Sequence, residues 1–392
     1  MLFFNRLQRF TLCLFLFSIP FEMWVPLESS ELSFAKITAM IYFLSILPQL
    51  PQFIRTENVK SVLLPALFFF ALLTSISIYN INEQFSEFFD MPIFLNIIIF
   101  GLLINHGRKD YMIIEKGMLF YLLGSVVLLM FFFAGIGVRY IGGRVSMFGD
   151  NQNQLGLKMA ISSIILLLAV IQNRLKIGWY RYLFFIPLPF MLYFIGKTGS
   201  RSATIAIVLA IVSGVILYKT KTSINKVMVV LFGSIFVILM GVLLMQNETL
   251  TSRLKATSES GDLGERDKIW KAASAIIMEN PIIGVGKTGY ANEFTEIWGA
   301  VESPHNVIIE VLCYTGIIGL FIYFIFLYQV FSRAYNTYQL NGWLLPLLLI
   351  IPVMGHILSG QILESKSGWV ILAYMVSSTA IKNQGQTKEN LI

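Results

Sequence analysis

The sequence predicts an all-α polytopic membrane protein with about twelve transmembrane helices, and three observations support this fold class. Of the 392 residues, 56% are hydrophobic and only 13% are charged. Mean hydropathy is +0.73, which is far from the mixture found in ordinary soluble domains. Long apolar windows recur along the whole chain. The lipid bilayer is therefore the expected solvent for most of its surface.

The apolar windows define the expected spans. Most hold roughly 17 to 25 mostly apolar residues, the length of helix that crosses the hydrocarbon core of a bilayer. We predict spans near residues 9–26, 33–50, 61–79, 90–105, 112–134, 153–172, 178–196, 201–218, 225–246, 304–331, 342–360 and 367–382.

The distribution of lysine and arginine predicts the orientation of these spans, because cations in short loops stay on the cytoplasmic side. With the N-terminus inside, only five fall in short outer loops. Fifteen fall in cytoplasmic segments: Arg6, Arg9, Arg55, Lys60, Arg108, Lys109, Arg174, Lys176, Arg181, Lys219, Lys221, Lys226, Arg333, Lys382 and Lys388. This bias places both termini in the cytoplasm and the one long loop, 246–303, outside.

The cations on the predicted outer face are exceptions to this bias, and an arginine retained there suggests another role. In the short loops they are Arg139, Arg144, Lys197, Arg201 and Lys366. The long loop adds Arg253, Lys255, Arg266, Lys268, Lys271 and Lys287. We therefore expect cations to converge outside. The net charge of +7 otherwise reflects the inside bias and attraction to anionic membrane lipids, and it does not imply a nucleic-acid partner.

The long outer loop contains an expected amphipathic helix. Between Gly264 and Pro281, apolar residues recur at helical spacing, with acidic residues first and Asn-Pro as the stop signal. Arg266 and Trp270 lie about one turn apart, so a guanidinium and an indole could face the same ligand. A solvated charged face is the alternative interpretation of Arg266.

His305 is the candidate general base. It lies in Glu302-Ser-Pro-His-Asn306, directly before a long apolar window, and a histidine at the membrane edge can titrate near neutral pH. It could take a proton from an acceptor hydroxyl within hydrogen-bond reach, with Glu302 or Asn306 fixing its tautomer. The alternative is an interfacial histidine that only caps the following helix.

Two glycine-rich turns are candidate anion sites on the outer face. The first, 142–156, offers Asp150 or Asn151 as a helix cap and glycines that permit close backbone approach. In the second, 196–201, backbone amides, Ser200 and Arg201 could cradle an anion at the start of a helix. An ordinary turn, with an arginine that snorkels from the helix end, is the alternative.

Several other chemistries lack support. In Gly284-Val-Gly-Lys-Thr-Gly289, Pro281 stands where a phosphate-binding loop needs its first glycine. Three scattered histidines and no Asp-x-Asp pair suggest no metal site, so neither a metal nor another cofactor is expected. No Gly-x-Ser-x-Gly nucleophile elbow occurs. Arginine is the expected means of charge neutralisation.

Four motifs, in this order, resemble those of the O-antigen ligase and polymerase family. They are Arg144 with Phe148-Gly-Asp-Asn-Gln-Asn-Gln-Leu-Gly156, then Thr198-Gly-Ser-Arg-Ser202, then Arg266-x-x-x-Trp270-x-x-Ala273 with Pro281-x-x-Gly284-x-Gly286, and finally Pro304-His-Asn306 with Gly316-x-x-Gly319. They cover residues 144–319, and the first 140 residues are similar only in their span pattern. We therefore expect N-terminal transmembrane helices at 1–140, a catalytic region at 141–332 that includes loop 246–303, and C-terminal helices with a cytoplasmic tail at 333–392.

The resemblance implies a glycosyltransferase of the GT-C type in the bacterial inner membrane, which uses undecaprenyl-diphosphate-linked glycan and needs no metal. It implies that His305 activates the acceptor hydroxyl and that Arg144, Arg201 and Arg266 hold the donor diphosphate. Family members often carry an acid two residues before the glycine that corresponds to Gly316. This chain has Tyr314 there and an acid at Glu310, so the role of a carboxylate in this span is open.

Two questions about function stay open at this point. The acceptor could be the growing polysaccharide, as in a polymerase, or the lipid A core, as in an O-antigen ligase, and either reaction would invert the anomeric carbon. A transporter or flippase of lipid-linked oligosaccharide is the alternative from another class. Transporters commonly show internal repeats and ionisable residues near the membrane midplane, whereas here the polar motifs gather at one face.

Overall fold

The structure is a computed structural model. It describes residues 2–26, 32–54, 60–79, 89–173, 176–219, 248–260, 266–360 and 362–378, together with isolated positions between 227 and 242.

Helices account for most of the described residues. They are α1 (Leu2–Ser18), α2 (Phe34–Ile46), α3 (Leu50–Phe53), α4 (Lys60–Tyr79), α6 (Met91–Lys109), α7 (Tyr111–Phe133), α8 (Gln152–Gln172), α9 (Leu188–Thr198), α10 (Arg201–Leu217), α12 (Glu248–Ser260), α13 (Arg266–Glu279), α14 (Gly286–Trp298), α15 (Val307–Asn341), α16 (Leu345–Leu348), α17 (Ile350–Ser359) and α18 (Lys366–Ser377). Short 3-10 helices are η1 (Ile19–Phe21), η2 (Leu47–Gln49) and η3 (Trp179–Phe185).

Six of the described helical segments are long and apolar enough to cross a membrane. They are 34–53, 60–78, 91–109, 112–133, 152–172 and 307–341, and α10 and residues 345–359 form shorter apolar helices. Large apolar side chains on these segments are exposed, among them Phe68, Phe321 and Tyr328. Such surfaces suit acyl chains rather than water. These features confirm the prediction of an α-helical membrane protein.

The described helices agree only in part with the predicted spans. The span predicted at 178–196 is the 3-10 helix η3 followed by the short helix α9, the span at 342–360 is divided between α16 and α17, and 225–246 lies mostly outside the described residues. The largest difference is α15, which continues to Asn341 and so runs through the domain boundary predicted at 332–333. The total of twelve spans and the division into domains stay predictions.

The loop 246–303 holds more structure than the single amphipathic helix predicted from the sequence. It contains α12, α13 and α14. The apolar face of α13 is buried, and its residues Ile269, Ala272, Ala273 and Ile276 pack in the core together with α14 and α15. The helical spacing predicted an apolar face on this helix. In the structure that face packs against other helices of the protein rather than against the membrane surface.

One element of the described chain departs from helix. Strands β1 (Val138–Ile141) and β2 (Arg144–Met147) form an antiparallel hairpin in which Val138 pairs with Met147. The turn of this hairpin contains Gly142 and Gly143, both with positive φ, as a tight two-residue turn requires. The all-α prediction missed this hairpin because its strands are only four residues long.

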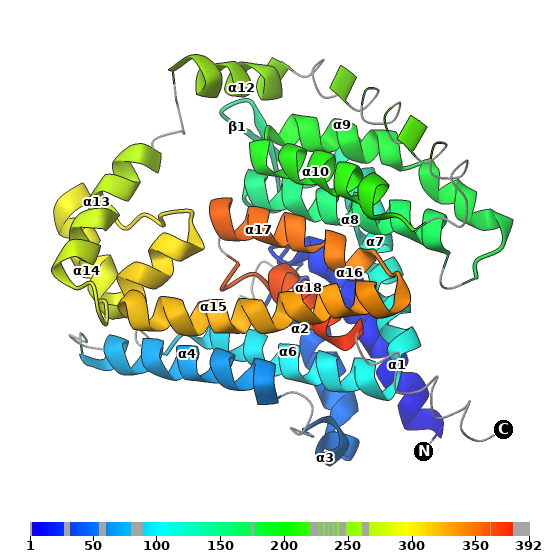
Figure 1. Ribbon diagram of the computed structural model, residues 1–392, viewed down its shortest axis with the longest axis horizontal. Coiled ribbons are helices and arrows are strands. Elements are labelled where there is room, and N and C mark those ends of the chain that lie inside the picture. Colours follow the sequence, from blue (N-terminus) through cyan, green and yellow to red (C-terminus); the bar gives the residue numbers. More distant parts are fainter. Residues whose placement is uncertain are drawn as a thin grey trace.

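The long helices run between two ends of the molecule. Figure 1 shows α13 and α14 at its left, next to the start of α15, whereas α1 begins at the lower right. The end of α17 lies at the same end as α13, because Arg266 of α13 contacts Ser359 of α17. The β1–β2 hairpin and the start of α10 also lie at this end, and Arg144 of the hairpin contacts Thr198 in the turn before α10. We call this the hairpin end, and the other, where α1 and α4 begin and α6 finishes, the α1 end.

Candidate active site

Four arginines from four different elements gather at the hairpin end. Arg144 begins β2, Arg201 begins α10, Arg253 lies in α12 and Arg266 begins α13. Burial lowers the pKa of Arg144 to about 10, and the positive charges of the other three arginines contribute to this shift. Burial and the charges of Arg201 and Arg253 also lower the pKa of Arg266. The three predicted arginines therefore come together, and Arg253, which the sequence suggested only as a loop cation, joins them.

The turn before α10 fixes Arg144. Its Nε donates to the Thr198 carbonyl oxygen at 2.8 Å, and its Nη2 donates to Asn153 Oδ1 at 2.7 Å. Gly199 in this turn has a φ of +59°, and a Cβ there would lie 3.3 Å from Arg144 Nε. The two glycine-rich turns that the sequence presents separately are thus one unit, joined through a guanidinium group.

Helix α12 closes over the same turn. Arg253 Nη1 donates to the Gly199 carbonyl oxygen at 2.6 Å, and Arg201 Nη1 donates to Thr257 Oγ1. The Ser200 hydroxyl is used locally, since it accepts the Ala203 amide as the cap of α10. Each arginine therefore reaches across to the other element, which holds α12 against the start of α10.

Arg266 connects α13 to the end of α17. Its Nη2 donates to the Ser359 carbonyl oxygen at 3.2 Å. Carbonyl groups in the last turn of a helix carry partial negative charge, so this contact favours the guanidinium group where it lies. The contact uses one nitrogen of the fork, and the charges of Arg201 and Arg253 act on the same group.

His305 lies beside this arginine cluster. It is half-buried in the segment between α14 and α15, with a φ of +50°, and its amide donates to Ser303 Oγ at 3.1 Å. Within the described part of the chain, no hydrogen bond to its imidazole is present. Burial lowers the pKa of His305, as does Arg266, while Glu302 opposes this change. The ring is therefore neutral near pH 7 and able to accept a proton.

The predicted supporting residues act mainly on the backbone around His305. Trp270 Nε1 donates to the Pro304 carbonyl oxygen at 2.9 Å, so its indole fixes the preceding peptide. Asn306 caps α15 by accepting the Ile308 amide at 3.0 Å. The side chain of Glu302 is exposed and acts on His305 through its charge.

Sequence analysis missed a buried contact beneath this segment. The Ser303 hydroxyl donates to Glu310 Oε1 at 3.0 Å, and the same oxygen of Ser303 accepts the His305 amide. Glu310 is buried in the first turn of α15. The Glu310 carboxylate thus supports the backbone of His305 through Ser303. Tyr314, which stands where family members often carry an acid, packs against the ring of Tyr290.

A break in α15 positions this whole segment. Gly316 has φ +59° and ψ −161°, a combination that essentially only glycine adopts. The freed groups pair with the turn after α13, because Ile317 donates to the Pro281 carbonyl oxygen at 3.0 Å and Val285 donates to that of Cys313 at 2.8 Å. The glycine-rich motifs around 284 and 316 therefore join α13, which carries Arg266, to α15, which follows His305.

We expect Gly316→Ala to destabilise the protein strongly. A Cβ at this position would lie 2.3 Å from the backbone of Ile282, and the strained backbone adds a cost of about 1–3 kcal/mol. The thermal unfolding midpoint of purified protein in detergent should fall. Gly101→Ala is the matched control, since a Cβ there meets Leu63 at 3.7 Å, an ordinary contact. Equal midpoints for the two variants would contradict the proposed role of the break.

Lys287 has a structural partner rather than a nucleotide. Its Nζ lies 2.6 Å from Asp90 Oδ2 and 2.6 Å from Glu364 Oε1, and its amide donates to Ser77 Oγ. The segment Gly284 to Gly289 thus fastens the start of α14 to α4, as expected for a turn that leads back to the membrane.

A buried ion cluster anchors the far side of the hairpin. Lys158 Nζ lies 2.6 Å from Asp150 Oδ2 and 3.4 Å from Glu22 Oε1, and all three side chains are almost fully buried. Ser146 in β2 donates to the Asp150 carbonyl oxygen at 2.7 Å. The strand that begins with Arg144 is therefore held at both of its ends.

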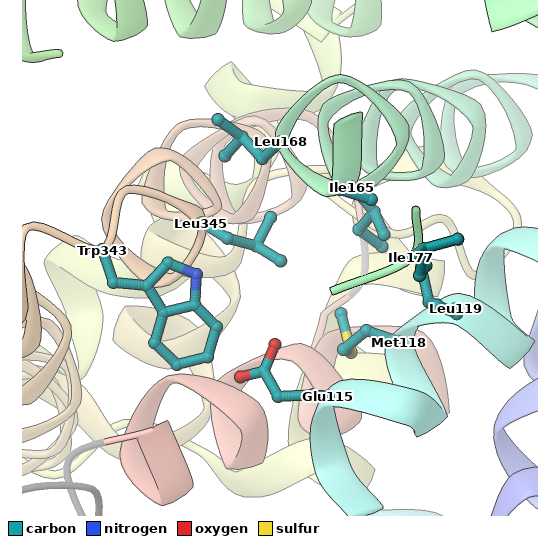
Figure 2. Close-up of a pocket in the computed structure, with 9 residues that line it drawn as sticks. Glu115, Met118, Leu119, Ile165, Leu168, Ile177, Trp343 and Leu345 are labelled. Atoms are coloured by element: carbon teal, nitrogen blue, oxygen red, sulfur yellow. The ribbon is translucent and has the colours of Figure 1, made fainter. Parts of the chain in front are cut away.

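Outside the arginine cluster, the described residues offer a small pocket and no metal-binding group. Among the described residues, no three His, Cys, Asp or Glu side chains lie together as metal ligands would. A pocket at the α1 end is lined by Glu115, Ile165, Trp343 and Leu345 among others, and Figure 2 shows the Glu115 carboxylate directed into it. Its accessible volume of about 30 Å³ suits a water molecule or two but no sugar or lipid.

The family comparison covers the centre of the chain. Residues 183–324 match the model of a family described as O-antigen ligase. The matched segment contains Arg201, Arg253, Arg266 and His305, while Arg144 precedes it. No curated protein matches the chain.

The match agrees with the motif resemblance found in the sequence. Similarity to this family supports a bacterial membrane protein with glycosyltransferase activity of the ligase or polymerase type, acting in general on a lipid-linked glycan donor and a polysaccharide or lipid acceptor. Through residues 183–324, this chain is similar to the O-antigen ligase family, and the match supports the resemblance carried by its motifs.

Proposed function

We propose that the protein transfers glycan from undecaprenyl diphosphate to an acceptor sugar on the outer face of the bacterial inner membrane. The observation that carries this proposal is the convergence of four arginines and one neutral histidine at one end of an apolar helix bundle. A diphosphate needs cations, and a hydroxyl nucleophile needs a base. Both occur here within one electrostatically connected group.

The arginines would stabilise the leaving group. As the bond between the sugar C1 and the diphosphate oxygen breaks, charge grows on that oxygen, and fixed guanidinium groups in a partly buried site stabilise it. Arg144, Arg201 and Arg266 are the proposed contacts to the diphosphate. Positive charge from arginine makes a metal unnecessary for this step, so we propose a metal-independent reaction.

His305 would accept the proton of the attacking hydroxyl. The acceptor oxygen forms a bond to C1 on the face opposite the leaving diphosphate, its proton passes to the imidazole, and undecaprenyl diphosphate departs. Attack from the opposite face inverts the anomeric carbon. The low pKa of His305 keeps the ring in the form that can accept this proton.

A direct assay tests this function and identifies the acceptor. Purified protein receives a repeat unit linked to undecaprenyl diphosphate, with and without lipid A core, in the presence or absence of a chelator. Chain extension alone would assign a polymerase, and transfer to lipid A core would assign an O-antigen ligase. No product with either acceptor would reject the proposal, and loss of product with chelator would reject the metal-independent step.

We propose that the active site is extracytoplasmic and that both termini are cytoplasmic. A Ser258→Cys variant should then react with a membrane-impermeant maleimide added to intact spheroplasts, because Ser258 is exposed on α12. Cys13 and Cys313 are buried, so background labelling should be low. Labelling only after the membrane is opened would reverse the proposed orientation.

The electrostatic contact between Glu302 and His305 predicts a shift in pH dependence. The charge of Glu302 raises the pKa of His305, so Glu302→Gln should lower this pKa further and move the acid limb of kcat/KM to lower pH. The contact is exposed, and high salt should diminish the shift. Glu296→Gln, an exposed charge on α14, is the control and should leave the limb unchanged. A shift to higher pH in Glu302→Gln would contradict the assignment.

A further inference from the structure

A second group of cations lies at the α1 end, far from His305. Arg108 is in the last turn of α6, and Arg333 lies toward the end of α15. Helix α4 packs against both of these helices. From Val307 to Arg333 a helix extends about 40 Å at 1.5 Å per residue. Any ligand held here is therefore distinct from the substrate of the proposed reaction.

The two guanidinium groups are neighbours, and among the described residues no acid is paired with either. Arg333 is near enough to act electrostatically on Arg108. Within the part of the chain that the structure describes, neither arginine forms a salt bridge. Arg108 Nε is also buried and has no hydrogen-bond partner. A buried donor without a partner and an uncompensated like-charge pair are both costly, and one bound anion would relieve both.

Ser61 adds a neutral donor to this pair. Arg333 Nη2 donates to Ser61 Oγ at 2.6 Å, which leaves the hydroxyl hydrogen to point elsewhere. Ser61 is the second residue of the 20-residue helix α4, and backbone amides in the first turn of a helix lack intrahelical acceptors. Two guanidinium groups, a hydroxyl and a helix N-terminus together match the oxygen atoms of a phosphate group.

The surface next to Ser61 indicates how such a phosphate would arrive. Leu64 and Phe68 follow Ser61 by three and seven residues, so all three share one face of α4. Their side chains are 47% and 64% exposed on a helix apolar enough to cross a membrane. A molecule with a phosphate at the helix end and acyl chains along this stripe would satisfy both surfaces.

We propose that Arg108, Arg333 and Ser61 bind the phosphate of an anionic lipid headgroup, with the acyl chains along Leu64 and Phe68. Inorganic phosphate shares the headgroup chemistry but would leave the apolar stripe uncovered. Scattered cations at a membrane surface attract lipid weakly and without a fixed site. In this site, the buried Nε and the arginine pair require an anion at one position.

Thermal unfolding of full-length protein in detergent tests the site. Phosphatidylglycerol should raise the midpoint, and phosphatidylcholine and inorganic phosphate at equal concentration should not. Arg108→Gln and Arg333→Gln should each raise the half-saturating concentration of phosphatidylglycerol by about tenfold or more, since each removes one charge-assisted contact. Lys116→Gln is the matched control, because Lys116 is an exposed cation near the α1 end.

The unliganded variants supply a second readout. Without lipid, Arg108→Gln and Arg333→Gln should be at least as stable as the native protein, because each relieves the repulsion within the pair. An unchanged response to phosphatidylglycerol in both variants would overturn the proposal. Equal stabilisation by inorganic phosphate would overturn the assignment to a lipid.

Discussion

Replacing His305 with asparagine should lower the rate of glycan joining by about 10²- to 10⁴-fold, the contribution typical of a positioned general base. Asparagine is the informative substitution because His305 has a φ of +50°. Asparagine adopts this left-handed region more readily than other non-glycine residues. The variant therefore removes the proton acceptor while it preserves the conformation of the segment between α14 and α15.

His305→Ala serves as the companion variant. Alanine also lacks a base, but it is strained at positive φ by about 1 kcal/mol. Both variants should lose activity to a similar extent, whereas only the alanine variant should show a lower unfolding midpoint. Binding of the lipid-linked donor should be retained in both, because the arginines remain. If the asparagine variant keeps more than a tenth of the native rate, His305 is not the base.

Helix positions could be predicted from the sequence because the bilayer imposes a simple rule of length and polarity. The windows near 61–79 and 153–172 correspond to α4 and α8 within two residues. The break at Gly316 could not be placed, because it lies within an apolar run that reads as one helix. Its cause is tertiary, since the freed backbone groups pair with residues 281–285.

The sequence points to candidate site residues where a charged or titratable side chain lies in an unexpected place. Arg144 and Arg201 stood out as cations in short outer loops, and His305 stood out at the edge of a span. Arg253 did not, because α12 is mostly polar and nothing in its sequence separates Arg253 from Lys255. Its contact with Gly199 depends on how α12 lies across the α9–α10 turn, which no local pattern encodes.

The role of Glu310 was also out of reach of sequence analysis. A carboxylate in an apolar span suggests either a coupled ion or a substrate contact. The structure instead pairs it with the Ser303 hydroxyl, seven residues away and in the segment that carries His305. A buried acid near a base can thus fix the backbone conformation without contacting the substrate. The hydrogen bond to Ser303 indicates this positioning role, which the sequence alone does not distinguish from a catalytic one.

Replacing Arg266 with glutamine should lower the rate of glycan joining by about 10²- to 10³-fold, as expected when one fixed donor to a developing oxyanion is removed. Arg266→Lys should be intermediate, because lysine keeps the charge but not the planar fork that binds phosphate oxygens in pairs. Arg139→Gln is the matched control. Arg139 is an exposed cation on the same hairpin as Arg144, and it is not among the charges that act on Arg144.

Stability should respond in the opposite direction to activity. Arg266 and Arg144 repel each other in the unliganded protein, so Arg266→Gln relieves repulsion, which offsets the loss of the one hydrogen bond that Arg266 donates to the Ser359 carbonyl oxygen. The unfolding midpoint without ligand should therefore stay equal or rise. Inorganic pyrophosphate, as a mimic of the donor diphosphate, should stabilise the native protein more than the variant.

The same substitution should also change the pH profile through His305. Because Arg266 lowers the pKa of His305, its loss raises this pKa, and the acid limb of the residual kcat/KM should move to higher pH, opposite to the shift in Glu302→Gln. A merely structural role for Arg266 would lower stability and leave the limb in place. Lower stability with an unmoved acid limb would contradict an arginine cluster that binds diphosphate beside the base. Opposite shifts of the limb in Arg266→Gln and Glu302→Gln would establish that both charges act on the imidazole of His305.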